Sequence, residues 1–258
     1  MKKILTYLLS GVLAFSVFSL KAQDKKETPK NFMTGGKNLI KINLTAIPLN
    51  NYSFQYERAI GRKTAAVLGV RFMPEGGIPL KSQIKNLIDD ENLSRQLDNF
   101  QTGNYAITPE IRFYMGKEGF RGFYIAPFAR YATYTASIPF EYEYDHPVNG
   151  TVKEVIPLKG ELSTLTGGLL LGSQFKLSKL VYLDWWILGP QYGTSNGNIK
   201  GTKNLSADEQ EALRGELQSL EELPLVKVTS EVNNSGAQVD FTGPWAGVRA
   251  GISLGFRF

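Results

Sequence analysis

Hydrophobic and polar residues alternate along much of the chain after residue 37, a pattern typical of β-strands with one apolar face. The last strand shows it most clearly. Every second residue from Ala246 to Phe258 is apolar, and Gly, Arg or Ser stands between them from Gly247 to Arg257. Similar alternation recurs in seven earlier segments. The eight predicted strands lie near residues 40–46, 52–57, 66–72, 105–114, 123–131, 165–175, 181–187 and 246–258.

The connections between these strands are mostly short and long in turn. The long ones cover about 74–103, 141–160 and 190–243. Outer-membrane barrels have this arrangement, with tight periplasmic turns and longer external loops. Apolar residues at helical spacing near 80–100 and 213–220 predict a helix in each of two external loops. The predicted fold is therefore all-β: an eight-stranded antiparallel transmembrane β-barrel, residues 38–258, with helical insertions in two external loops.

Alternation alone does not decide which face of the strands points inward, because a soluble lipocalin-like barrel that binds a ligand inside would show the same period. Acidic and basic residues are interleaved on the polar face, as a narrow membrane barrel requires for its interior. The predicted interior charge network consists of Glu57, Arg71, Glu110, Arg112, Arg130, Asp184 and Arg249. Aromatic residues near strand ends, predicted to lie at the membrane interfaces, are Tyr52, Tyr56, Tyr105, Tyr131 and Trp245.

The N-terminus has the features of a secretory signal peptide. Two lysines precede an apolar run from Ile4 to Leu20, and Ala22-Gln23 is the predicted cleavage junction. We therefore expect a signal peptide at 1–22 and a polar spacer at 23–37. The chain has no Cys, which excludes disulfides and thiolate metal sites. Three of the five net positive charges lie within the signal peptide, so no nucleic-acid partner is expected.

Ala250 to Phe258 resembles the C-terminal targeting signal of outer-membrane barrel proteins, in which alternating apolar residues end on an aromatic residue. Residues 38–73 and 108–134 resemble the small, functionally uncharacterised outer-membrane β-barrel proteins of Bacteroidota. This resemblance implies the fold, a location in the bacterial outer membrane, and contact with its lipids and with the barrel assembly machinery, but no activity. The predicted assembly signal comprises Ile252, Leu254, Phe256 and Phe258.

Candidate catalytic chemistry is sparse, so we expect no enzyme, no cofactor and no metal site. The single histidine, His146, could act with Ser137 as a lipid-modifying hydrolase or acyltransferase, which is the alternative function. A passive pore is disfavoured because side chains fill the lumen of an eight-stranded barrel. The leading interpretation is a non-enzymatic structural or interaction module at the cell surface. Its loop helices either pack on each other over the barrel or form a docking surface for a protein partner.

Overall fold

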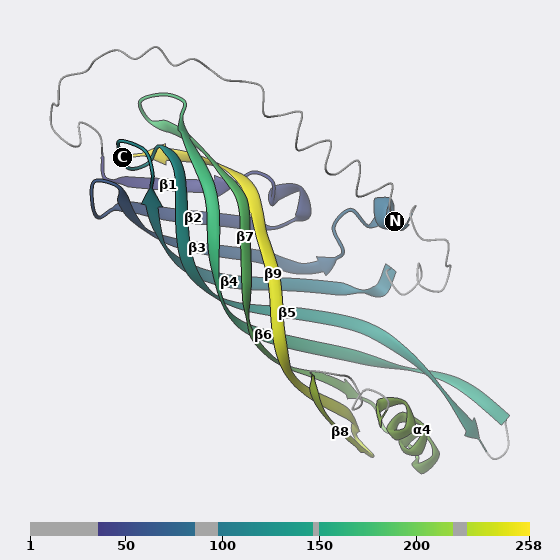
Figure 1. Cartoon of the computed structure of the whole chain (residues 1–258). Coiled ribbons are helices and arrows are strands. Elements are labelled where there is room, and N and C mark those ends of the chain that lie inside the picture. The colour runs from purple at the N-terminus through teal and green to yellow at the C-terminus, as the bar shows by residue number, and fades with distance from the viewer. Residues whose placement is uncertain (1–35, 86–97, 147–149, 219–225) are drawn as a thin grey trace, which may run out of the picture. The chain divides into compact units, whose positions relative to one another are not determined.

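The strands form one antiparallel sheet that closes on itself, because the first strand pairs with the last (Figure 1). The computed structural model describes residues 36–85, 98–146, 150–218 and 226–258. The predicted signal peptide (1–22) and nearly all of the predicted spacer (23–37) lie outside these residues. The described residues belong to one compact unit that reaches Phe258.

Nine strands and three short helices make up the described chain. The strands that form the closed ring are β1 (Asn38–Asn43), β2 (Tyr52–Ala59), β3 (Thr64–Gly77), β4 (Gln101–Tyr114), β5 (Gly122–His146), β6 (Gly150–Lys176), β7 (Val181–Thr202) and β9 (Gly236–Arg257). Outside the ring are the 3-10 helix η1 (Ile47–Leu49), the helices α2 (Lys81–Lys85) and α4 (Ala207–Gln218), and the strand β8 (Lys227–Asn233).

The ring closes where β1 lies beside the C-terminal part of β9, with Ile40 opposite Phe256 and Ile42 opposite Leu254. The strand order is β1-β2-β3-β4-β5-β6-β7-β9, and β8 pairs with the N-terminal part of β9. The sheet therefore contains nine strands, one more than the sequence predicts. The additional strand, β8, forms a hairpin with β9 instead of taking a place between two ring strands.

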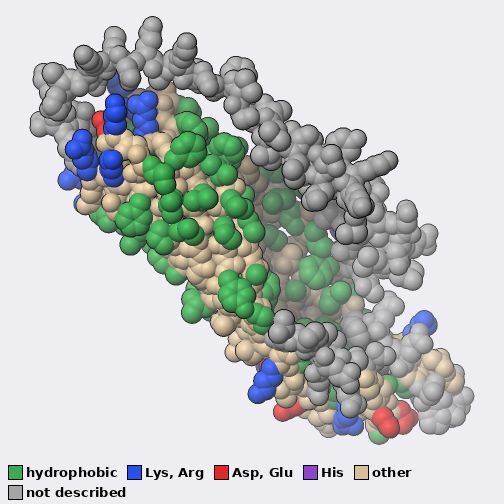
Figure 2. Space-filling view, in the orientation of Figure 1, with side chains coloured by type: hydrophobic (Ala, Val, Ile, Leu, Met, Phe, Trp, Pro, Cys, Tyr) green, Lys and Arg blue, Asp and Glu red, His purple; other side chains and the backbone are tan. Residues whose placement is uncertain are grey.

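Apolar side chains face outward and polar ones inward, which is the reverse of a soluble barrel. Ile40 on β1 is 51% exposed, whereas its neighbour Lys41 is 1% exposed. On β4, Ile111 and Phe113 are 45% and 50% exposed around a fully buried Arg112. Figure 2 shows hydrophobic side chains spread over the outer face of the strands. Because side chains of a strand alternate between its faces, each strand carries both surfaces at once.

Two predicted loops prove to be mostly strand. The hairpin of β5 and β6 continues to His146 opposite Gly150, within the loop expected at 141–160. β7 extends to Thr202 and β9 begins at Gly236, within the loop expected at 190–243. In the β7 extension, Asn196, Asn198 and Lys200 occupy one face, while Ser195 and Gly197 occupy the other, so neither face is clearly apolar. Without one apolar face, the period of two that marks a strand is weak there.

Two prolines lie on the seam between β4 and β5, where each removes a backbone donor from the ladder. The pairing along this seam passes from Ile107 opposite Tyr131 to Glu110 opposite Phe128, and next to Phe113 opposite Ile125. Pro109 and Pro127 lie in the two interruptions. Each interruption spans two paired positions, and the strands remain in the same register across both gaps.

The helical segments lie in the loops opposite the short turns. α4 is preceded by a capping box: the Ser206 amide donates to Glu209, and the Glu209 amide donates to Ser206 Oγ. Of the helix predicted near 80–100, the structure describes α2 and a few residues from 98 onward. Asp98 accepts a hydrogen bond from Lys85 at 2.6 Å and pairs with Lys81 at 3.1 Å, and both contacts lower the pKa of its carboxyl.

Candidate functional site: the barrel interior

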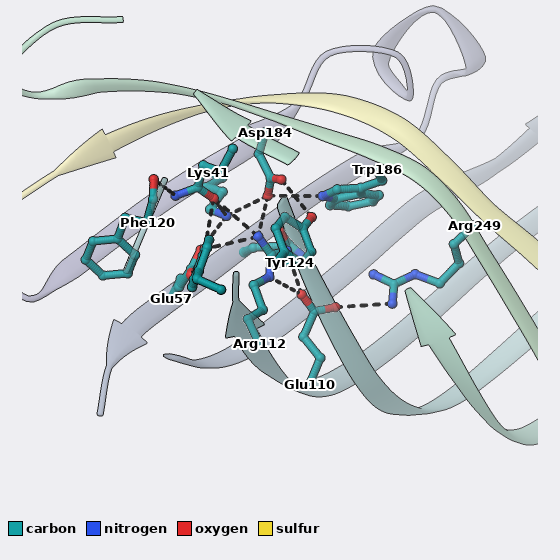
Figure 3. A network of polar contacts seen from close by, with 12 residues as sticks. Lys41, Glu57, Glu110, Arg112, Phe120, Tyr124, Asp184, Trp186 and Arg249 are labelled. Carbon is teal, nitrogen blue, oxygen red and sulfur yellow. Dashed lines mark hydrogen bonds and ion pairs between the residues drawn. The ribbon is translucent and has the colours of Figure 1, made fainter. Parts of the chain in front are cut away.

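The barrel is closed inside by charged side chains that come from five of its strands (Figure 3). β4 contributes two of them, because Glu110 and Arg112 are two residues apart and therefore share a face. The others come from strands on either side of the ring. These inward-facing charges are Lys41 on β1, Glu57 on β2, Glu110 and Arg112 on β4, Asp184 on β7 and Arg249 on β9.

Arg112 occupies the centre of this cluster and touches all three carboxylates. Its Nη1 lies 2.6 Å from Asp184 Oδ2 and 3.4 Å from Glu57 Oε2, while its Nη2 lies 2.6 Å from Glu110 Oε1. The guanidinium stacks 4.3 Å from the ring centre of Tyr124. A planar guanidinium suits this position, because its five N–H donors spread over three nitrogens and can face several carboxylates at once.

Lys41 provides the second cation, at the seam where β1 closes the ring. Its ammonium forms ion pairs with Glu57 and, at 2.6 Å, with Asp184 Oδ2. A third contact, also 2.6 Å, reaches Gln174 Oε1 on β6. The strand beside it leaves room for the stem, because a Cβ at Gly255 would lie 3.1 Å from Lys41 Cγ. Lys41 is not among the predicted network residues, although its place between Ile40 and Ile42 puts it on the polar face of the strand.

Arg249 is the third cation, on the closing strand. Its Nη1 lies 3.2 Å from Glu110 Oε2, so Glu110 bridges Arg249 and Arg112. Aromatic rings enclose the guanidinium, whose carbon lies 4.4 Å from the ring centre of Phe128 and 5.1 Å from that of Trp186. Such cation–π contacts are strongest where water is excluded.

Neutral groups complete the hydrogen bonding of the carboxylates. Tyr124 donates to Asp184 Oδ1 at 2.7 Å, Trp186 donates to Asp184 Oδ2 at 3.2 Å, and Tyr114 donates to Glu57 Oε1. Gly172 makes room for the Tyr124 ring, because a Cβ there would collide with it. Small residues facing large ones let a narrow barrel hold these aromatic rings.

The cluster is electrically balanced, with three carboxylates facing three cations. All its members except Arg249 are at most 3% exposed, and Arg249 is 9% exposed. Separate buried charges would each cost several kcal/mol, a penalty that pairing and added hydrogen bonds offset. The arrangement therefore acts as a plug, which fixes five strands to one another and fills the lumen at this level.

Two of the predicted network residues lie apart from the plug. Arg71 donates from Nε to Asn51 Oδ1 at 2.8 Å, and Arg130 donates from Nη1 to Thr108 Oγ1 at 3.2 Å. Among the described residues, neither guanidinium forms an ion pair with a carboxylate. Both face a cavity on the side of the plug away from the short turns, together with Arg249.

Four of the five predicted interfacial aromatics face outward. Tyr52, Tyr56, Tyr105 and Tyr131 are all exposed, on β2, β4 and β5. The prediction was wrong for Trp245. Its odd number places it on the same face of β9 as Arg249, and its ring contacts that of Tyr134 at a centroid distance of 5.7 Å. The four residues of the predicted assembly signal, Ile252, Leu254, Phe256 and Phe258, all lie exposed along the outer face of the closing strand.

The structure does not support the proposed pairing of His146 with Ser137. Both residues belong to β5, nine positions apart. Extended strand rises about 3.3 Å per residue, so their backbones lie roughly 30 Å apart. A general base must approach its nucleophile to hydrogen-bond distance. The side chain of His146 lies outside the described part of the chain, as does most of the helix predicted near 80–100.

α4 packs on the strand extensions beyond the barrel. Leu213 is buried with Ile156 on β6 and Leu205, and Tyr144, Leu158 and Val232 pack around them. Leu213 and Leu217 of the predicted stripe are therefore buried against this chain, and the part of the stripe after Gln218 lies outside the described residues. Among the described residues, no cluster of three His, Cys, Asp or Glu could hold a metal ion.

Comparisons with known proteins add little to this description. No protein-family model matches the chain, and no curated protein matches it in sequence. The N-terminal β-barrel domain of Pseudomonas aeruginosa OprF aligns with 7% identity and a TM-score of 0.25, covering 87% of this chain and 99% of that one. The β domain of the Bordetella autotransporter BrkA aligns with 12% identity and a TM-score of 0.21, with the same coverage of both chains.

At TM-scores this low, the likeness does not define the fold, and the assignment rests on the chain's own strand pairing. That pairing defines a closed antiparallel β-barrel with an apolar outer face and a buried, balanced charge cluster inside. Within the described ranges, no helix is both long and apolar enough to cross a membrane.

Proposed function

We propose that this chain is a non-enzymatic outer-membrane β-barrel with a plugged lumen, which presents an interaction module at the cell surface. The inverted polarity of its strands is the observation that carries the proposal. In water, a continuous outer face of Ile, Leu, Val and Phe would cost about 25 cal/mol per Å² of apolar surface left exposed. Within hydrocarbon the same face costs nothing, and the backbone groups are satisfied by the closed ring.

The length of the apolar band supports a membrane setting. On β4, the outward residues run from Tyr105 to Phe113, about nine residues, which is the length that a tilted transmembrane strand needs. Exposed basic residues gather at the end with the short turns, where phospholipid headgroups would lie (Figure 2). They are Lys37, Arg62, Lys63, Lys117, Arg121, Lys176 and Lys179.

The plug supports a role other than passive transport. Arg112, Glu57 and Asp184 are fully buried and joined across the lumen, so an ion would have to break several ion pairs to pass. Eight-stranded barrels have interiors just wide enough for their own side chains. The purified protein should therefore show no reproducible single-channel conductance in a planar bilayer.

The extension beyond the band supports a surface role. β5, β6, β7 and β9 continue past the outward aromatic residues, and α4 and β8 are packed on them. Within the described chain, β8 pairs with no strand except β9, and Arg214 of α4 donates to the Val232 carbonyl of β8 at 3.1 Å.

Cell fractionation with a gel-shift assay tests the proposal. The full-length protein should sediment with outer membranes and resist extraction by high salt. Because folded barrels keep their shape in mild detergent, the unboiled sample should migrate differently from the boiled one. A folded protein in the soluble periplasmic fraction would contradict the proposal and favour a lipocalin-like barrel.

A further inference from the structure

The barrel wall is incomplete along one edge of β9. On the side away from β7, residues 253–257 of β9 pair with β1 and residues 236–242 pair with β8. Between them, residues 243–251 pair with no described strand on that side. β1 ends at Asn43 and β2 begins only at Tyr52, so this hairpin is shorter than its neighbours (Figure 1). The barrel wall therefore extends less far from the short turns here than around the rest of the ring.

The short hairpin is apolar at its tip. Ile47 and Leu49 in η1 are 41% and 43% exposed, and Leu44 just before them is exposed as well. Three exposed apolar side chains so close together suit contact with lipid better than contact with water, although Thr45 and Asn50 lie beside them. In the membrane setting proposed above, the gap beside β9 therefore opens toward the lipid side as well as toward the interior.

A cavity of about 300 Å³ lies directly inside this gap. Its inner wall includes Arg71, Arg130 and Arg249, while Ala46 and Leu49 belong to the hairpin and Val248 and Ala250 to the free edge. Val248 and Ala250 lie on the outward face of β9, whereas Arg249 lies on the inward face. Because the cavity contacts residues on both faces of β9, it must extend around an edge of that strand. Its entrance therefore lies along β9.

The inner wall carries positive charge that the plug does not balance. Arg249 shares Glu110 with Arg112, whereas Arg71 hydrogen-bonds to Asn51 and Arg130 to Thr108 and Tyr134, which are all neutral side chains. Gln55 also lines the cavity, and its amide oxygen accepts a hydrogen bond from Arg112 at 3.2 Å.

We propose that this cavity binds the anionic headgroup of an amphiphile, whose acyl chain leaves through the gap beside β9. Arg71 and Arg130 bind the phosphate or carboxylate by charge-assisted hydrogen bonds. Ala46, Leu49, Val248 and Ala250 contact the first carbons of the chain at the entrance. The volume lies at the lower end of the range of small-ligand pockets, which suits a headgroup rather than a whole lipid.

The test uses the purified full-length protein in a non-ionic detergent, and native mass spectrometry counts the molecules bound. The three probes are lysophosphatidic acid, lysophosphatidylcholine and inorganic phosphate. We expect one saturable site for lysophosphatidic acid, with the other two binding at least tenfold more weakly, because one lacks the net charge and the other the chain. Equal binding of either control would overturn the proposal. The assay needs no membrane, so its result is independent of where the protein resides in the cell.

Variants of the cavity separate the headgroup site from the entrance. The double variant R71Q/R130Q should weaken lysophosphatidic acid binding at least tenfold, whereas R62Q, an exposed arginine in the β2–β3 turn, should leave it unchanged. Should the double variant fail to fold, A250W decides, since it keeps both arginines and fills the entrance from the outer face of β9. Wild-type affinity in folded R71Q/R130Q, or in A250W, would show that the amphiphile binds elsewhere.

Discussion

Replacing Arg112 with Leu tests the plug most severely, because this guanidinium touches every carboxylate of the cluster. The variant leaves three buried acids, Glu57, Glu110 and Asp184, facing two cations, Lys41 and Arg249. Glu110 keeps one partner, at 3.2 Å, and Asp184 keeps Lys41. Removing one partner of a buried pair typically costs 3–5 kcal/mol, so we expect a loss of about that size in the free energy of unfolding.

Urea unfolding of the protein refolded into lipid vesicles, followed by tryptophan fluorescence, measures this loss. The matched control is Lys63→Leu in the exposed β2–β3 turn, which should change stability by no more than about 0.5 kcal/mol. A double variant, R112L/D184N, removes one charge of each sign and should be less destabilised than the sum of its single variants, since the two residues are in contact. Similar losses for R112L and K63L, or strict additivity in the double variant, would refute the reasoning.

Three further predictions concern the wall and the extension. Gly172→Leu should prevent folding, since the leucine side chain would collide with Tyr124. The control variant Gly167→Ala, on the outer face, should fold normally. Heat-dependent gel migration distinguishes the folded variant from the unfolded one. Deleting residues 256–258 should abolish assembly of the barrel. Phe256 and Arg257 pair with β1, so their loss leaves backbone groups unpaired in hydrocarbon. A folded, soluble product would contradict this prediction. Leu213→Asp should release α4 from Ile156 and Leu205, and limited proteolysis should then detect new cleavage near α4. The barrel of this variant should keep its heat-dependent gel shift. Loss of that shift would show that α4 supports the barrel itself.

The ring strands could be predicted because one face of each is apolar and exposed. The period of two at Ile107, Ile111 and Phe113 is visible in the sequence without any knowledge of pairing. The extensions of β5, β6, β7 and β9 have no continuous apolar face of this kind, and some of their buried residues, such as Ile156, are covered by α4, which is distant in the sequence. Trp245 was misplaced for a different reason. Its position in the alternation puts it on the polar face of its strand, but it was assigned to the membrane interface because it is aromatic.

The charged interior was predicted in outline and not in detail. The polar face identifies which residues point inward, but the contacts among them depend on register, and register depends on which strands are neighbours. Lys41 joined the plug because β1 lies between β2 and β9, a closure that no local pattern encodes. For the same reason, the separation of Arg71 and Arg130 from the carboxylates emerged only from the folded chain.

The central claim is that the apolar face of this barrel meets lipid and the charged face meets its own interior. Spin labels at single introduced cysteines test it directly, and the natural chain has no Cys to interfere. In vesicles, labels at Ile107 and Ile111 should be accessible to oxygen dissolved in the bilayer, and a label at Thr108 between them should be shielded. Water-soluble reagent reaching positions 107 and 111 while 108 stays shielded would show that no bilayer covers the outer face, and would contradict the account.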